Sequence, residues 1–268
     1  MANMITDGTL GLTFPDTTSM NSAAQLGMRN LLINGNFNFN QRGYVSGTAT
    51  TAANQYTLDR WRVITSGQAL TFATSGNGNI VTAPAGGIEQ IIEGASIGIA
   101  SGVINWVGTA TCTVDGNAKT KGQTVTLTPG TNSSVKFFGG TVSLAQQEAG
   151  AVPSPFEYRA MNVELAMCMR YFQLVRNAVG IVGTSTSVYR LNSKFTTPMR
   201  TAPSVTLNGT VNLQLGNQSG SISSIGVTYA TFEALECDAN IVSTTATIGS
   251  AVVAMTGSTG SIACSAEF

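Results

Sequence analysis

The side chains that could do chemistry in this chain are carboxylates, because the sequence contains no histidine. Without an imidazole, Ser-His-Asp and Cys-His catalytic groups and histidine-ligated metal sites are excluded. Two carboxylates held several ångströms apart could still hydrolyse a glycosidic bond. The acidic residues considered for this role are Asp59, Glu89, Glu93, Asp115, Glu233, Glu236 and Asp238.

The spacing of these carboxylates does not favour catalysis. Glu233, Glu236 and Asp238 are close in sequence, but in a strand-and-turn region short spacing does not aim two groups at one sugar. The sequence shows no internal period of the kind that builds a β-solenoid, and no phosphate-binding or nucleotide-binding glycine motif. We therefore expect no enzymatic activity, no cofactor and no metal site.

Aromatic side chains offer a second kind of chemistry, the binding of sugars. Trp61, Trp106 and Tyr44, with Tyr56 near them in sequence, could present flat apolar faces to pyranose rings, while Asn and Gln amides bind hydroxyls. The competing interpretation places Trp61 in the core, because Trp61 and Val63 share one face of a strand.

The charged residues next to Trp61 are expected to find partners elsewhere. In a regular strand Asp59 and Arg60 point to opposite faces, so they do not form a simple ion pair with each other. An ion pair of either residue with Arg42 or Glu157 is the alternative.

The composition excludes several classes of partner. Thirteen basic and thirteen acidic residues cancel, so no basic field attracts nucleic acid, and no apolar run is long enough for membrane insertion. Charged residues make up only 10% of the chain, which suits a surface partly covered in an oligomer. Residues 201–268 contain acidic but no basic residues, which indicates either a solvated surface or an acidic patch for a cation or basic partner. The four cysteines have no metal-binding spacing and are expected to be buried free thiols.

The elements that would position these residues are mostly strands. Leu31, Ile33, Phe37 and Phe39 alternate across Asn34-Gly35-Asn36, which predicts a strand with one buried face and a break or bulge at the glycine. Further strands are expected at residues 70–74, 103–107 and 124–128, with glycine-rich and asparagine-rich turns between them. Residues 29–159 therefore read as a jelly-roll β-sandwich.

The segment before this domain, residues 1–28, is too short to form its own core. Leu10, Leu12 and Phe14 alternate as in a strand, and Pro15-Asp16 predicts a turn. We interpret the segment as an attachment arm for a larger assembly, the alternative being a disordered leader.

One helix is expected at residues 160–177. Asn162 is the predicted N-cap, and Met161, Leu165, Cys168, Met169, Phe172 and Val175 form one helical stripe. The stripe either covers the core of its own domain or is a seam between identical helices.

Strands resume in the last segment, residues 178–268, which is predicted to be a second, smaller β-sandwich. Asn208-Gly209 lies between the strand-like residues 205–207 and 211–215, which predicts a two-residue hairpin. The fold class is therefore all-β, with two β-sandwich domains joined by one α-helix.

Several stretches resemble one family, the bacteriophage tail-fibre and virion appendage proteins. They are residues 29–43, 56–61, 146–159, 164–173 and 195–205, which occur in the expected order. The resemblance implies a carbohydrate-binding-module-like jelly roll, a linking helix and a C-terminal β-domain. Met169 departs from the pattern, because glutamine is common at this position, and makes the helix more apolar.

The resemblance also implies a function. It suggests a structural, non-enzymatic virion subunit, assembled in the host cytoplasm as a homotrimer and attached to other virion proteins through residues 1–28. Host-surface glycans are the expected ligands. The alternative is a free-standing bacterial carbohydrate-binding module or adhesin without a virion role.

Overall fold

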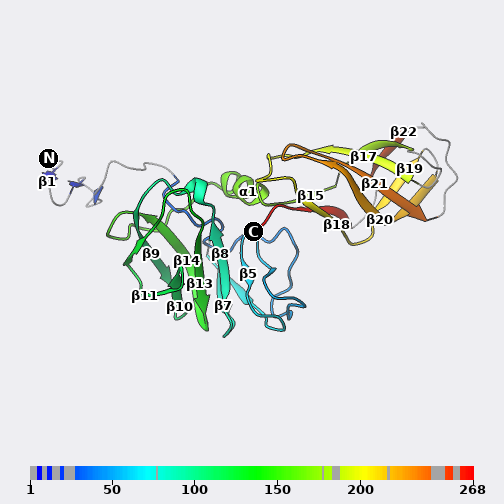
Figure 1. Ribbon diagram of the computed structural model, residues 1–268. Coiled ribbons are helices and arrows are strands. Elements are labelled where there is room, and N and C mark those ends of the chain that lie inside the picture. The colour runs from blue at the N-terminus through cyan, green and yellow to red at the C-terminus, as the bar shows by residue number, and fades with distance from the viewer. Residues whose placement is uncertain are drawn as a thin grey trace. The chain divides into compact units, whose positions relative to one another are not determined.

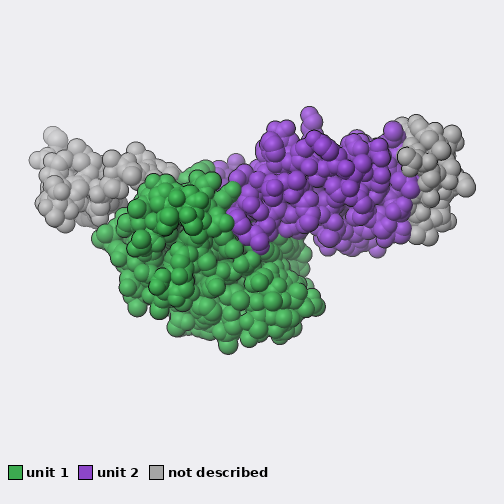
Figure 2. All heavy atoms as spheres, viewed as in Figure 1, with its two compact units in different colours: residues 1–161 green, residues 162–268 purple. Residues whose placement is uncertain are grey.

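The computed structural model describes residues 5–7, 11–13, 19–20, 28–76, 78–176, 178–182, 188–215, 218–242, 251–255 and 260–268. The described part is mostly antiparallel β-structure with one α-helix, so the predicted all-β fold class is confirmed (Figure 1). The chain divides into two compact units, residues 1–161 and 162–268 (Figure 2). Each unit has its own hydrophobic core. None of the helices in the described part has the length and apolar character needed to cross a membrane.

Three short strands precede residue 28. They are β1 (Ile5–Asp7), β2 (Gly11–Thr13) and β3 (Ser19–Met20), paired antiparallel in that order. The predicted strand through Leu10, Leu12 and Phe14 overlaps β2 at Leu12, and its other residues lie outside the described part of the chain. The attachment role of this segment stays a prediction.

From residue 28 on, unit 1 contains two facing sheets and a short 3₁₀ helix, η1 (Gly94–Ser96). The strands are β4 (Gln55–Tyr56), β5 (Arg62–Val63), β6 (Thr71–Ser75), β7 (Gly78–Ala83), β8 (Ile88–Ile92), β9 (Ser101–Val107), β10 (Thr111–Val114), β11 (Asn117–Lys119), β12 (Gln123–Thr126), β13 (Ser133–Phe138) and β14 (Gly140–Ala149).

The strand order of unit 1 is that of a jelly roll. One sheet runs β11-β10-β13-β8-β5-β4, and the other runs β12-β9-β14-β7-β6. The chain changes sheet between β7 and β8, β8 and β9, and β9 and β10. In consequence β14 lies between β7 and β9, while β13 lies between β8 and β10. This interleaving is the Greek-key arrangement of jelly rolls, with β4, β5 and β6 added at the edges.

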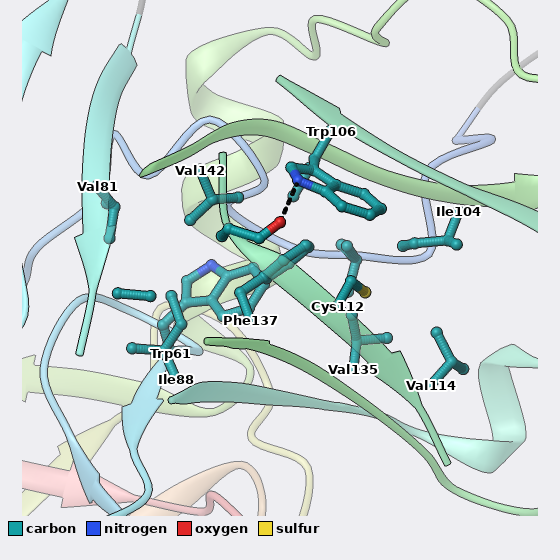
Figure 3. Packing of buried hydrophobic residues seen from close by; sticks show 14 of the residues in the cluster. Trp61, Val81, Ile88, Ile104, Trp106, Cys112, Val114, Val135, Phe137 and Val142 are labelled. Atoms are coloured by element: carbon teal, nitrogen blue, oxygen red, sulfur yellow. Dashed lines mark hydrogen bonds between the residues drawn. The ribbon is translucent and has the colours of Figure 1, made fainter. Parts of the chain in front are cut away.

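Alternating burial explains why these segments form strands around one core. In β13, Ser133, Val135 and Phe137 are buried, whereas the residues between them are partly exposed. Side chains from both sheets meet in the core, with Val81 and Val142 from one sheet and Phe137 from the other (Figure 3). The period of two places alternate residues of each strand in this core.

The predicted opening strand over Leu31–Phe39 is wrong. Residues 31–40 form bends, a turn and irregular backbone, and no strand of the described chain includes them. Asn34 and Phe37 have φ angles of 57° and 58°, which are left-handed conformations that interrupt a strand. Leu32 and Ile33 are both buried although they are adjacent in sequence, so the segment does not have one buried and one exposed face.

Unit 2 consists of one helix and two antiparallel sheets. The elements are α1 (Met161–Met169), which begins at the last residue of unit 1, β15 (Phe172–Val175), β16 (Val179–Val182), β17 (Val188–Lys194), β18 (Ser204–Asn208), β19 (Asn212–Leu215), β20 (Gln218–Ala230), β21 (Ala234–Val242), β22 (Ala251–Met255) and β23 (Ser261–Ser265). One sheet has the order β15-β23-β18, and the other closes on itself in the order β16-β17-β21-β20-β19-β22. In place of the second β-sandwich expected here, unit 2 has one small sheet and one closed sheet.

The predicted helix over residues 160–177 is too long. The helix ends at Met169, and Phe172 already belongs to β15, where it pairs with Ser265 of β23. The last two members of the predicted stripe, Phe172 and Val175, are buried on this strand. Backbone pairing with β23, about ninety residues away, overrides the local helical pattern, which is a common limit of propensity.

The hairpin predicted at Asn208-Gly209 is also wrong. Gly209 has a φ of 74°, as a turn glycine can. The strands on its two sides nevertheless join different sheets, because β18 pairs with β23 and β19 pairs with β20 and β22. The turn therefore carries the chain from one sheet to the other.

Candidate functional site

The two tryptophans considered for sugar binding lie inside unit 1. Trp61 is 0% exposed and Trp106 is 4% exposed, and both pack against Phe137 with ring centroids 5.9 Å and 5.4 Å apart (Figure 3). The Trp61 Nε1–H donates to the carbonyl of Asn34 (3.0 Å), and the Trp106 Nε1–H donates to that of Ala110 (3.2 Å). The core interpretation therefore replaces the sugar-binding one, because neither indole has a face open to a pyranose ring.

The third candidate, Tyr44, holds a loop against the edge of a sheet. Its hydroxyl accepts a hydrogen bond from Leu70 N–H (3.1 Å) and lies 2.6 Å from the carbonyl oxygen of Thr48. Two residues further, the Ser46 hydroxyl accepts from Phe72 N–H on β6 (2.8 Å). Ser46 thus satisfies a backbone group of the edge strand β6, and Tyr44 does the same for Leu70, the residue just before β6, so both help to cover that edge.

The sequence stretches behind the family resemblance in unit 1 meet at one place, beginning with Asn30. The Asn30 amide donates to the carbonyl of Ala145 (3.0 Å), and its oxygen accepts from Leu32 N–H (3.0 Å) and Gln147 N–H (3.1 Å). The Glu157 carboxylate accepts from the backbone N–H groups of Arg29 and Asn30, both at 2.9 Å. The opening motif is thus tied to the stretch 146–159.

Asn34 ties the same motif to residues 59–61. Its side-chain nitrogen donates to the carbonyls of Phe39 (2.9 Å) and Asp59 (3.0 Å), and its side-chain oxygen accepts from Phe39 N–H (3.0 Å). Next to it, the Gln90 amide pairs with both backbone groups of Ile33 at 2.8 Å. We call Asn30, Asn34 and Gln90 the amide clasp. Its amides replace the backbone pairing that a strand would provide.

The structure also brings together a row of side chains whose proximity the sequence did not predict, although Tyr56 and Glu89 were each candidates on their own. Tyr56, Arg62, Glu89 and Lys136 are direct cross-strand neighbours on β4, β5, β8 and β13. The adjacent residues Val63, Ile88, Val135 and Phe137 are in the core, so this polar row lies on the outer face of the sheet.

The contacts within this polar row centre on the buried carboxylate of Glu89. Arg62 donates to Glu89 through Nε (2.7 Å) and Nη2 (2.5 Å), Ser134 Oγ–H donates at 2.5 Å, and Lys136 Nζ is 3.5 Å away. Burial raises the pKa of Glu89, but the hydrogen bonds from Ser134 and Arg62 and the two positive charges outweigh it and lower the pKa overall. Glu89 therefore stays ionised at neutral pH and does not act as a general acid.

A second ion pair borders the polar row. Arg42 Nη1 lies 3.6 Å from Asp59, so one of the two partners considered for this region is present. The guanidinium groups of Arg42 and Arg62 lie 5.2 Å and 5.9 Å from the centre of the Tyr56 ring. Asp59 and Glu89 are buried, whereas the side chains of Arg42, Arg62 and Lys136 retain partial exposure. The outer surface thus presents hydrogen-bond donors around an aromatic ring, which suits binding of a polar ligand more than proton transfer.

No sequence pattern pointed to the polar row. Arg62 and Glu89 are 27 residues apart, and Ser134 is 45 residues from Glu89. The one local sign was the alternation within Ile88–Ile92, where period two places Ile88 and Ile92 on the core face and directs Glu89 away from it.

The acidic residues near the end of the chain are partly neutralised by Arg190. Its Nε lies 3.0 Å from Asp238 and 3.4 Å from Glu236, both on the neighbouring strand β21. The hydrogen bond from Arg190, more than its charge, lowers the pKa of Asp238. Within the described residues, no three His, Cys, Asp or Glu side chains are grouped as a metal site would require.

The remaining candidates are the helix stripe and the cysteines. In α1, Cys168 is buried and Leu165 and Met169 are half-buried, whereas Phe172 lies on β15 and not on the helix. A seam between identical helices stays a prediction for these residues. The predicted buried free thiols are confirmed, and burial raises the pKa of Cys112, Cys237 and Cys264 to about 12.

Comparison of this chain with known proteins gave no match among protein-family models, curated proteins or solved structures.

Proposed function

We propose that this chain is a non-enzymatic structural subunit of a bacteriophage fibre or other virion appendage. In this proposal it assembles as a homotrimer in the host cytoplasm and attaches to other virion proteins through residues 1–28. Unit 1 is the module that contacts glycans on the host surface. The observation that carries the proposal is the convergence of the family-like stretches 29–43, 56–61 and 146–159 on one amide clasp in a jelly roll.

The convergence supports a module because the distinctive polar residues act on backbone groups. Asn30, Asn34 and Gln90 bind backbone donors and acceptors across sequence separations of up to 117 residues. Buried amides used in this way specify one chain path, since leaving their partners unpaired would cost about 1–3 kcal/mol for each group. The resemblance is therefore supported at the level of architecture.

The polar row supports the glycan-binding part of the proposal. Tyr56, Arg62 and Lys136 offer an aromatic ring and charged donors on an outer sheet face, and these are the groups that bind sugar rings and hydroxyls. Glu89 holds Arg62 and Lys136 from below, which fixes the donors before a ligand arrives.

The proposal is tested by measuring the mass and the glycan binding of the full chain. We expect a stable trimer by light scattering and binding to bacterial surface glycans on an array. Tyr56→Ala and Lys136→Ala should each weaken that binding by about tenfold, as expected for a loss of roughly 1.4 kcal/mol. Lys194→Ala, an exposed lysine of unit 2, is the matched control and should not change it.

Three results would count against the proposal. A monomer with tight glycan affinity would favour a free-standing carbohydrate-binding module or adhesin. Release of reducing sugar ends from a bound glycan would contradict a non-enzymatic role. A trimer that binds no glycan would contradict the attachment role and leave the assembly role.

A further inference from the structure

One margin of unit 2 consists of strand edges without charge. Residues 201–232 contain no Asp, Glu, Lys or Arg, although they include all of β18 and β20. The two strands contact each other, so this uncharged stretch is a connected part of the unit. We call β18, residues 223–230 of β20 and Phe232 the neutral margin.

Both strands of the neutral margin have an edge that no strand of the described chain pairs with. β20 pairs with β19 only up to Ser221, whereas its pairing with β21 continues to Ala230. β18 pairs with β23 and is the last strand of its sheet. Such edges present backbone donors and acceptors that can pair with another chain.

Large apolar side chains are exposed along the same margin. Val227 is 46% exposed, Tyr229 is 63% exposed, and Phe232, just past the end of β20, is 51% exposed. Three exposed apolar side chains within six residues are more than the scattered single residues usual on a protein surface.

The usual protection against edge pairing is only partly present here. Lysine residues, inward charges, proline and bulges keep most natural edge strands apart. The neutral margin has no charge, and Pro203 lies just before β18 rather than within it. Two bulges in β20, between Ile222 and Ser224 and between Val227 and Tyr229, bend the strand. A partner therefore meets short edge segments and apolar side chains together, not one long regular ladder.

We propose that the neutral margin is the surface through which unit 2 binds a second copy of this chain. The partner has to supply strand-edge hydrogen bonds and apolar side chains without placing a charge against an uncharged surface. The same margin of another copy meets all three requirements, and 10% charged residues in the whole chain fits a surface that is covered by assembly. The inference rests on the proposed function only for the expectation that the chain assembles.

The test is the mass of the full chain and of charge variants, measured by sedimentation equilibrium across micromolar concentrations. The double variant Val227→Lys/Tyr229→Lys is expected to weaken self-association at least tenfold, because it replaces two apolar side chains with charges that would lie against the uncharged margin of the second copy. The matched control is Val179→Lys on β16, a strand paired on both edges whose Val179 is 59% exposed. The control should associate like the wild type.

Crosslinking gives a second readout, which detects the contact directly and does not depend on weakening self-association. Tyr229→Cys should form covalent dimers with a short bismaleimide, whereas Val179→Cys should not. The native cysteines are buried and do not compete for the reagent. Circular dichroism of every variant shows whether it is folded.

The outcomes separate this inference from the proposed function. If the wild type assembles and Val227→Lys/Tyr229→Lys assembles equally well, the neutral margin is not the interface, and the structural-subunit proposal stands. If the wild type is a monomer at all concentrations, both the neutral-margin interface and the homotrimer are overturned.

Discussion

Asn34 is the residue whose removal should most clearly test the amide clasp. Its side chain makes three hydrogen bonds, to Phe39 N–H, the Phe39 carbonyl and the Asp59 carbonyl, and the residue is fully buried. Each lost bond should cost about 1 kcal/mol. Its φ of 57° adds about 1 kcal/mol for alanine, since left-handed backbone favours asparagine and glycine. Asn34→Ala should therefore lower the free energy of unfolding of unit 1 by about 4 kcal/mol.

The assay for this loss is urea unfolding followed by tryptophan fluorescence. Both tryptophans of the chain lie in the core of unit 1, so the signal reports on that unit alone. With a slope near 2 kcal/mol/M, the midpoint should fall by about 2 M. Asn34→Gly removes the same amide but keeps a residue suited to positive φ, so it should be about 1 kcal/mol less harmful.

The matched control for Asn34 is Asn38, which is exposed and lies in the same motif. Asn38→Ala should change the stability by no more than about 0.5 kcal/mol. If Asn34→Ala unfolds within 1 kcal/mol of Asn38→Ala, the amide does not stabilise this chain path and the reasoning about the clasp fails. If Asn34→Gly equals Asn34→Ala, the backbone part of the argument is wrong.

Three further predictions follow from the same structure. The pKa of Glu89 is lowered in the folded chain, so its contribution is present above the unfolded pKa of about 4.3 and is lost as the pH falls through the folded pKa. Glu89→Gln should thus lose less stability than the wild type between pH 7 and pH 3, and equal losses in urea titrations would contradict this. A thiol reagent at pH 8 should label no cysteine quickly in the native chain and all four in urea, since burial raises three of the thiol pKa values to about 12 and all four thiols are buried. Arg200→Lys should lower the stability of unit 2 by about 1–2 kcal/mol, because Arg200 donates to two carbonyls and lies 4.1 Å from the Phe268 ring centre. If circular dichroism shows the same thermal unfolding temperature of unit 2 for Arg200→Lys and the wild type, that role of Arg200 is contradicted.

Some strands of unit 1 could be predicted from local pattern, whereas its opening segment and several elements of unit 2 could not. Expected strands at residues 103–107 and 124–128 coincide closely with β9 and β12, because period-two burial is encoded in neighbouring residues. The helix end at Met169 and the separation of β18 from β19 depend on β23, which is far away in sequence. Pairing with a distant strand leaves no pattern in the neighbouring sequence from which it could be predicted.

The candidate site was less predictable than the fold for a related reason. The sequence left two interpretations of Trp61 open, a sugar-binding residue or a core residue in a strand-like context, and its complete burial agrees with the second. The polar row, in contrast, depends on the register of β5 on β8 and of β8 on β13. Register is set by the whole sheet, and a shift of one residue would direct Glu89 into the core. Sequence reasoning therefore finds which residues are apolar but not which polar residues meet.

The misread opening motif shows how a fold-specifying sequence can resemble a binding surface. Leu31, Ile33, Phe37 and Phe39 alternate as in a strand, and this pattern predicts that the asparagines between them are exposed. In the folded chain Asn30 and Asn34 point at backbone groups, with Asn30 reaching the carbonyl of Ala145, 115 residues away. A side chain cannot hold a distant backbone group in the core and also bind a ligand at the surface. In such a module, ligand-facing residues have to be sought on sheet faces that the motif does not occupy. In this chain that criterion selects the polar row of Tyr56, Arg62, Glu89 and Lys136 rather than the asparagines of the opening motif.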